Sequence, residues 1–184
     1  MIKLMNLLKE NSQGVYEYGC VMLYFNFPQL GKIQEYIDEE DIYEDPEDPS
    51  YGLEDEPHIT LLYGLHDNVS LEQVKEIIDN FTFSTEEIYN VSLFENEKYD
   101  VLKFEVADTE LLTKVNKELK TLPYTSKFND YQAHMTIGYI KPGMGKKYVD
   151  KFKDLRFAIN PSYVVYSYSS DGEKQKEIIQ INID

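Results

Sequence analysis

Two short segments, HITLLYGL from His58 and HMTIGYIKPG from His134, share one pattern, and this repeat constrains the fold more than any other feature of the chain. Both open with His-x-Thr, and together they hold two of the three histidines. Side chains two positions apart in a strand point to the same face, so His58 lies beside Thr60 and His134 beside Thr136. The pattern therefore predicts two matching strands, each with one buried face and one face that carries an imidazole and a hydroxyl.

Strict alternation also assigns the other side chains of these strands. Each segment contains a glycine, Gly64 or Gly138, and the two segments stand about half a domain apart, which indicates an internal duplication. The residues expected on the buried faces are Ile59, Leu61 and Tyr63 in the first strand and Ala133, Met135, Ile137 and Tyr139 in the second.

The rest of the chain predicts two αβ repeats in the order βαβαββαβαββ. Ser70 and Gln73 form a capping box before an amphipathic helix, and Asp171-Gly172 is typical of a hairpin turn. The other expected elements are strands at 19–27, 89–93, 102–106, 163–170 and 177–184, and helices at 28–37, 109–122 and 148–152. Antiparallel sheets with outer helices follow from this order, so we expect an α+β fold in which two lobes face each other across a cleft.

Length and composition fit a single domain that spans residues 1–184. The chain is 42% hydrophobic, which is enough to build a core without disulfides, and its one cysteine, Cys20, lies in an apolar run typical of a buried thiol rather than a nucleophile. The first residues contain no apolar core of signal-peptide length, and no run is long enough to span a bilayer. We therefore expect a cytoplasmic protein without a membrane partner.

The net charge of −16 bears on the partners of the protein. A strongly acidic surface repels the phosphates of long nucleic acids, whereas a short or cyclic nucleotide can enter a pocket that holds a few cations and hydroxyls. Eleven acidic residues fall within residues 38–56, which we call the acidic segment. Such a run is typical of a solvated loop, and its place just before His58 also allows a lid over that residue.

The four repeated side chains can support acid–base chemistry without a metal or cofactor. Histidine titrates near neutrality, so one imidazole can act as a base while the other acts as an acid. The threonine hydroxyls would bind phosphate oxygens as negative charge develops on them. A metal site formed by His58, His134 and an acidic-segment carboxylate is the alternative, but it leaves Thr60 and Thr136 unexplained.

With both motifs intact, the chain resembles the 2H phosphoesterases, a superfamily named for its two H-x-T/S motifs. The run from Ile37 to His66 resembles the phage anti-CBASS branch of this superfamily, whose members cleave the cyclic oligonucleotide messengers of bacterial immunity. The resemblance implies a bilobed fold with a central cleft, and it implies that His58, Thr60, His134 and Thr136 are catalytic. It also implies a cyclic di- or trinucleotide substrate, and a host cytoplasm as the place of action if a phage encodes the protein.

Residues outside the repeats are weaker candidates. The chain has sixteen tyrosines, and aromatic rings can stack on bases, with Tyr18 preferred here over Tyr124 and Tyr131. Resemblance to the cyclic-nucleotide branch suggests that Glu173 reads a base edge, although a surface turn residue is an equal reading. Two further candidates have ordinary explanations: Lys141 is either a phosphate ligand or a solvated lysine, and His66 is expected in a loop.

Three functional hypotheses remain. The first is metal-independent cleavage of the 3′–5′ bonds of a cyclic di- or trinucleotide. The second is a 2H phosphoesterase that acts on 2′,3′-cyclic phosphates or RNA ends. The third is a non-enzymatic acidic protein that mimics DNA, and that activity would survive replacement of either repeated histidine. The oligomeric state is left open by the sequence.

Overall fold

The protein is described by a computed structural model that covers residues 18–126, 130–170 and 173–184. Its strands and helices are, in chain order, β1 (Gly19–Asn26), α1 (Gln29–Gln34), the short 3₁₀ turn η1 (Glu39–Asp41), β2 (His58–Leu65), α2 (Leu71–Ile78), β3 (Thr82–Phe83), β4 (Glu86–Glu95), β5 (Asp100–Val106), α3 (Glu110–Leu119), β6 (His134–Ile140), α4 (Lys146–Phe152), β7 (Arg156–Ser170), β8 (Glu173–Ile179) and β9 (Asn182–Ile183).

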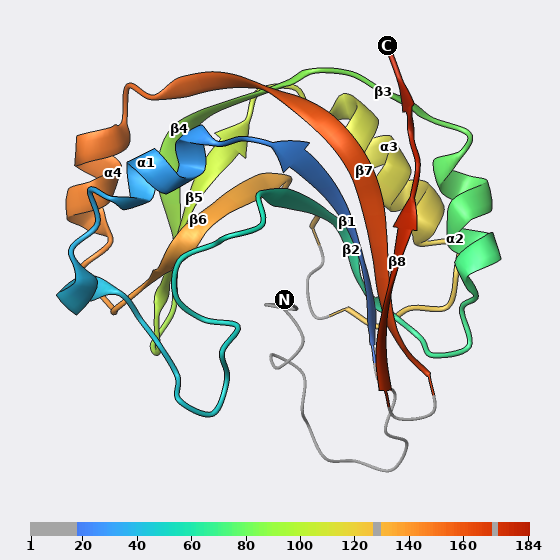
Figure 1. The fold of residues 1–184 in the computed structure, drawn as a ribbon, viewed down its shortest axis with the longest axis horizontal. Coiled ribbons are helices and arrows are strands. Elements are labelled where there is room, and N and C mark those ends of the chain that lie inside the picture. The colour runs from blue at the N-terminus through green and yellow to red at the C-terminus, as the bar shows by residue number, and fades with distance from the viewer. Residues whose placement is uncertain (1–17, 127–129, 171–172) are drawn as a thin grey trace.

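The main sheet is antiparallel and bends into two lobes. Its order is β1-β2-β6-β5-β4-β7-β8, and the long strand β7 also pairs with β1. Residues 156–159 of β7 pair with β4, while residues 160–167 pair with β1, so β7 passes from one lobe to the other. We call β1, β2, β8 and the second part of β7 the β2 lobe, and β4, β5 and β6 the β6 lobe. Figure 1 shows α2 and α3 beside the first lobe and α1 and α4 beside the second.

The predicted elements are largely present, with differences at their ends. The capping box forms, since Ser70 accepts a hydrogen bond from the Gln73 amide and the Gln73 side chain accepts one from the Ser70 amide. The first helix ends at Gln34 rather than at residue 37, because the chain continues there in tighter turns. The predicted last strand is divided, and β9 pairs in parallel with β3 in a small separate sheet. The predicted Asp171-Gly172 turn lies outside the described residues.

The two sequence repeats exchange parts between the lobes. Helix α1 follows β1 in sequence but packs on β6, and α3 follows β5 but packs on β2. The segments before the two His-x-Thr strands cross in the same way. Residues 41–54 precede β2 and hydrogen-bond along the edge of β6, whereas residues 123–125 precede β6 and hydrogen-bond to the end of β2. Each lobe is therefore completed by chain from the other repeat.

Glycines permit the close approach of these crossing segments. A Cβ atom on Gly64, which has a φ of +104°, would lie 1.9 Å from the carbonyl oxygen of Thr125. A Cβ atom on Gly138 would lie 2.8 Å from the Leu53 side chain and 3.2 Å from the carbonyl oxygen of Gly52. Side chains at either position would push the crossing segment away, which explains why both repeats contain a glycine.

The acidic segment is only in part the solvated loop that its charge predicts. Asp41, Asp48 and Glu54 are buried, with 3–7% of their surface exposed. Lys147 of α4 forms ion pairs with Asp38 and Asp41, and the Tyr148 hydroxyl also hydrogen-bonds to Asp41. The segment follows β6 because β2 and β6 share a single register pair and then diverge, leaving backbone groups of β6 to be paired.

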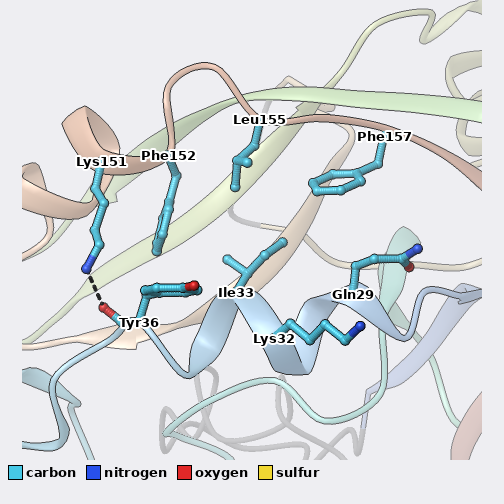
Figure 2. Close-up of a pocket in the computed structure, with 8 residues that line it drawn as sticks. All are labelled: Gln29, Lys32, Ile33, Tyr36, Lys151, Phe152, Leu155 and Phe157. Carbon is cyan, nitrogen blue, oxygen red and sulfur yellow. Dashed lines mark hydrogen bonds between the residues drawn. The ribbon is translucent and has the colours of Figure 1, made fainter.

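The large hydrophobic cluster lies on the face of the sheet opposite to the two repeated histidines. It includes Ile59 and Met135, which stand between the His and Thr of each motif. The same side of the β6 lobe carries a pocket of about 390 Å³ between α1 and the α4–β7 connection, bordered by apolar side chains and the stems of Lys32 and Lys151 (Figure 2). Within the described part of the chain, no helix is long and apolar enough to cross a membrane.

Candidate active site

The two His-x-Thr motifs meet where β2 and β6 pair. The single register pair between these antiparallel strands joins Ile59 to Met135, and both side chains are fully buried in the core. Their sequence neighbours must point to the opposite face, with His58 toward Thr136 and Thr60 toward His134. The structure thus brings the four predicted residues together around an approximate two-fold axis.

The two imidazoles are held in the same way. Nδ1 of His58 lies 2.7 Å from the carbonyl oxygen of Glu56, and Nδ1 of His134 lies 2.7 Å from that of Gln132. A carbonyl oxygen only accepts, so in each neutral ring the proton is on Nδ1 and the lone pair is on Nε2. Each motif thereby presents an imidazole nitrogen that can take up a proton.

A bulge after each threonine changes the faces that strict alternation assigns. The pairing of β1 with β2 skips Leu61, and the pairing of β5 with β6 skips Ile137. Tyr63 and Tyr139 are buried as predicted, but they lie on the same face as the histidines rather than on the opposite face predicted for them. The prediction was wrong at these two positions because an extra residue in one strand reverses the alternation beyond it.

Amide side chains from the crossed helices donate hydrogen bonds to the backbone carbonyl oxygens of the bulged residues. Nδ2 of Asn116 in α3 donates to the carbonyl oxygen of Leu61 at 2.6 Å. Nε2 of Gln34, at the end of α1, donates to the carbonyl oxygen of Ile137 at 2.8 Å. Because a bulge leaves backbone groups without a partner in the ladder, these two contacts stabilise both bulges and fix the motif backbones.

A buried lysine lies next to His134. Lys103 of β5 pairs in register with Thr136, and only 3% of its surface is exposed. Its ammonium donates to Ser92 at 2.7 Å and to Glu105 at 2.6 Å, and it lies 4.2 Å from the centre of the Phe94 ring. Such partners offset the cost of burying the charge.

These surroundings lower the pKa of His134 to about 4. Burial contributes most, and the positive charges of Lys103 and His58 act in the same direction, while the hydrogen bond with the Gln132 carbonyl and the charge of Glu105 oppose them. The Phe94 ring meets the His134 imidazole edge-on, with 4.9 Å between the ring centres. At neutral pH, His134 is therefore an uncharged imidazole, and the interaction with His58 indicates that the two rings share one site.

His58 has a different environment. Its ring stacks on Tyr24 with 5.5 Å between centres, and Tyr24 stacks in turn on Tyr163 at 5.3 Å. Oε2 of Glu54 lies 4.0 Å from Nδ1 of His58. A carboxylate thus lies beside the imidazole of the β2 lobe, whereas a buried lysine paired with a carboxylate lies beside the imidazole of the β6 lobe.

Aromatic side chains lie on both sides of the four motif residues. The β2 lobe carries a small apolar cluster on the histidine face, formed by Cys20, Met22, Tyr24, Tyr63 and Val165. In the β6 lobe, Tyr139 contacts a group of tyrosines from the acidic segment and the β4–β5 turn, namely Tyr43, Tyr51 and Tyr99. Rings of this kind can stack on nucleobases.

The Cys20 thiol is buried, as predicted. Burial raises its pKa to about 12, although a hydrogen bond with Thr60 opposes the change. A thiol in this state is a poor nucleophile. Cys20 therefore has a structural role: it hydrogen-bonds to the Thr60 side chain and packs in the small apolar cluster of the β2 lobe.

Most of the weaker candidates lie farther from the motif residues, whereas Tyr131 contacts Thr60. Tyr18 contacts Tyr63 and His66 near the end of β2 that is remote from His58. Glu173 begins β8, and its side chain lies outside the described residues. Three others contact neighbouring segments: Lys141 donates to the Glu40 carbonyl, His66 contacts the Thr125 hydroxyl, and Tyr131 donates to the Thr60 carbonyl. Tyr124 is exposed and forms a bridge with Leu65.

Two residues that lie beside the histidines, Lys103 and Tyr24, were not predicted. Lys103 lies in an alternating strand, VLKFEV, where Leu102 and Phe104 predict that it faces solvent. Tyr24 lies in a continuous apolar run, where nothing distinguishes one face from the other. No group of three His, Cys, Asp or Glu side chains among the described residues is placed to hold a metal ion.

Solved structures with a similar fold are found, whereas comparisons of the sequence find no match. The sequence matches no protein-family model and none of the curated proteins. Usb1 from Kluyveromyces marxianus superposes with a TM-score of 0.50 at 10% identity, over 88% of this chain and 98% of Usb1. Usb1 with uridine monophosphate gives 0.55 at 8% identity, over 89% and 98%. LigT from E. coli with 3′-AMP gives 0.49 at 12% identity, over 89% and 97%. The chain thus has the α+β fold of the 2H phosphoesterases.

Proposed function

We propose that this protein is a metal-independent phosphodiesterase that cleaves the 3′–5′ bonds of cyclic di- or trinucleotides. The observation that carries the proposal is the meeting of His58, Thr60, His134 and Thr136 on one face of the β2–β6 pair. Two imidazoles with available Nε2 atoms and two hydroxyls supply what phosphodiester cleavage needs from a protein: a base, an acid and donors for the phosphate oxygens.

The reaction transfers one proton at each end of the cleaved bond. One imidazole takes the proton of the attacking hydroxyl, either a ribose 2′-OH or water, as the new O–P bond forms. The other imidazole gives its proton to the 5′ oxygen as the P–O5′ bond breaks. Thr60 and Thr136 donate hydrogen bonds to the non-bridging oxygens, whose negative charge increases in the transition state.

A small nucleotide fits the surroundings of the site. With a net charge of −16, the protein repels long nucleic acids, whereas one partly exposed tyrosine on each lobe, Tyr163 beside Tyr24 and Tyr51 beside Tyr139, offers a stacking surface to a base. The likeness to Usb1 with uridine monophosphate supports a nucleotide ligand. Resemblance of residues 37–66 to phage anti-CBASS nucleases supports the messengers of bacterial immunity as substrates, so that their cleavage in the host cytoplasm would suppress the defence.

A second substrate class is a 2′,3′-cyclic phosphate or an RNA end. The likeness to Usb1 with uridine monophosphate, a single nucleotide, also supports this class, and the same four residues would serve either substrate. DNA mimicry has less support from the structure, since Asp41, Asp48 and Glu54 are buried and the acidic segment does not present all its charge to a partner.

The test is cleavage in EDTA of a panel that holds cyclic di- and trinucleotides, a 2′,3′-cyclic nucleotide and a short RNA, with the products resolved by chromatography. We expect the wild type to open a cyclic oligonucleotide, and His58→Ala or His134→Ala to lower the rate by about 100-fold or more. His66→Ala is the matched control, because the third histidine lies outside the site, and it should keep full activity.

Each outcome separates the candidates. Cleavage of only the 2′,3′-cyclic nucleotide or the RNA would select the second substrate class. Wild-type rates in His58→Ala or His134→Ala would overturn the proposed roles of these residues, and binding of a nucleic-acid-binding protein that survives both changes would favour mimicry.

A further inference from the structure

The approximate two-fold symmetry of the site fails at the residues that surround the two histidines. On the β6 lobe, Lys103, Glu105 and Ser92 form a charged network beside His134. On the β2 lobe, His58 stacks on Tyr24, and Oε2 of Glu54 lies 4.0 Å from its Nδ1. Two chemically identical imidazoles are thus placed in different electrostatic environments.

The strand register directs the charged network at His134. Lys103 is opposite Thr136, and Glu105 is opposite His134, so both side chains lie on the face of the site. The Phe94 ring contacts both the Lys103 ammonium and the His134 imidazole, which limits the water between them. A charge held in such a place acts more strongly than one on the surface.

The other groups that face His134 act on its pKa in both directions. They are Glu105 on β5, His58 on β2 and the carbonyl oxygen of Gln132. Glu105 favours the protonated imidazole, but its carboxylate is bound by Lys103 and Ser92, and the effect of Lys103 on His134 is the larger of the two. The hydrogen bond with the Gln132 carbonyl also favours protonation, but burial of the ring together with the charges of Lys103 and His58 outweighs it and keeps the imidazole uncharged.

We propose that Lys103 is a positioning residue whose buried charge keeps His134 as the proton acceptor and thereby leaves His58 as the proton donor. This inference rests on the proposed function and assigns a direction to it. His134 removes the proton from the attacking hydroxyl, while His58, beside the Glu54 carboxylate, protonates the departing oxygen. Lys103 is too deeply buried to contact the substrate and acts through His134 alone.

The experiment measures the titration of His134 without any substrate. With ¹³C-labelled histidine, NMR follows the three imidazoles across pH, and His58→Ala and His66→Ala assign the signals. We expect a midpoint near pH 4 for His134 in the wild type. In Lys103→Met the midpoint should rise by about one pH unit or more, and in Lys103→Arg, which keeps the charge, it should stay near the wild-type value.

Two further variants complete the test. Glu105→Gln removes the group that favours protonation, so the midpoint should fall, opposite to Lys103→Met. Lys141→Met is the matched control, because the Lys141 ammonium is bound to the Glu40 carbonyl, and it should leave His134 unchanged. A merely structural lysine would not produce opposite shifts, and it would not move the acidic limb of the kcat/KM profile toward higher pH in Lys103→Met.

The inference is overturned if a folded Lys103→Met has the wild-type midpoint. If that variant does not fold, the inference is overturned when the midpoint of His134 rises rather than falls in Glu105→Gln. A failure of this inference can be told apart from a failure of the proposed function. Cleavage that needs both histidines, with an unmoved midpoint, would reject only the role of Lys103, whereas a moved midpoint in a protein that cleaves nothing would reject the phosphodiesterase.

Discussion

At the scale of single residues, short-range contacts hold the two histidines in the same way, whereas contacts with residues distant in the sequence give the two rings different surroundings. The hydrogen bond from each Nδ1 to the carbonyl two residues earlier is identical in both motifs. The environment of each ring comes instead from other strands, with Tyr24 on β1 beside His58 and Lys103 on β5 beside His134. Repetition in the sequence thus provides two equivalent groups, and packing gives them separate roles.

Replacement of the threonines tests the binding of phosphate oxygens. Thr60→Val and Thr136→Val keep the shape of the side chain and remove its hydroxyl, so we expect each to lower kcat/KM by about 100-fold with little change in fold. The measurement is steady-state cleavage of the best substrate of the panel. Thr113→Val, at an exposed position of α3, is the control. Unchanged kinetics in both site variants would remove the threonines from the mechanism.

At the scale of elements, the site depends on segments that cross between the lobes. The bulges after the threonines turn Tyr63 and Tyr139 toward the site, and amides from the crossed helices bind the bulged residues. The crossing chains approach closely only because Gly64 and Gly138 have no side chain. Loss of one crossing contact should therefore disturb a His-x-Thr strand rather than a loop alone.

Gly64→Ala should destabilise the protein. The alanine Cβ would meet the Thr125 carbonyl oxygen, and a φ of +104° is unfavourable for any residue with a side chain, so we expect a loss on the order of 3 kcal/mol in the free energy of unfolding. Urea denaturation measures it. Gly31→Ala is the matched control, since a Cβ there meets nothing within 4 Å in helix α1, and it should be neutral or slightly stabilising. Equal stability of the two variants would contradict the close approach.

At the scale of the whole molecule, exchange of helices between the repeats joins the two lobes. α1 belongs to the first repeat and packs on β6, α3 belongs to the second and packs on β2, and β7 runs through both lobes. Neither repeat can bury its apolar surface alone, because part of its partner surface is supplied by the other. The lobes should therefore lose their structure together.

Urea unfolding should follow one transition. The chain has sixteen tyrosines and no tryptophan, so tyrosine fluorescence reports on packing in both lobes, while far-UV circular dichroism reports on the backbone. We expect the two curves to share one midpoint and one slope. Separate midpoints would show that one lobe can persist without the other and would contradict the interleaved arrangement.

Local features account for what could be predicted from the sequence. Periodicity placed His58 and His134 on strands beside their threonines, and the Ser70 capping box marked the start of α2. Such features depend on residues a few positions apart, whose geometry is set by the backbone itself. A resemblance based on the two motifs led to the fold that the structural comparisons support.

The amino-acid sequence by itself determined which side chains could do chemistry and that they would occur on two matching strands, because these properties follow from residue type and short-range spacing. Only the tertiary structure decided that Tyr63 and Tyr139 face the site, that part of the acidic segment is buried, and that Lys103 lies beside one histidine. Those outcomes depend on strand register and on contacts between residues far apart in the chain, and a single inserted residue reverses a face. The difference between the two histidines is therefore a property of the assembled sheet.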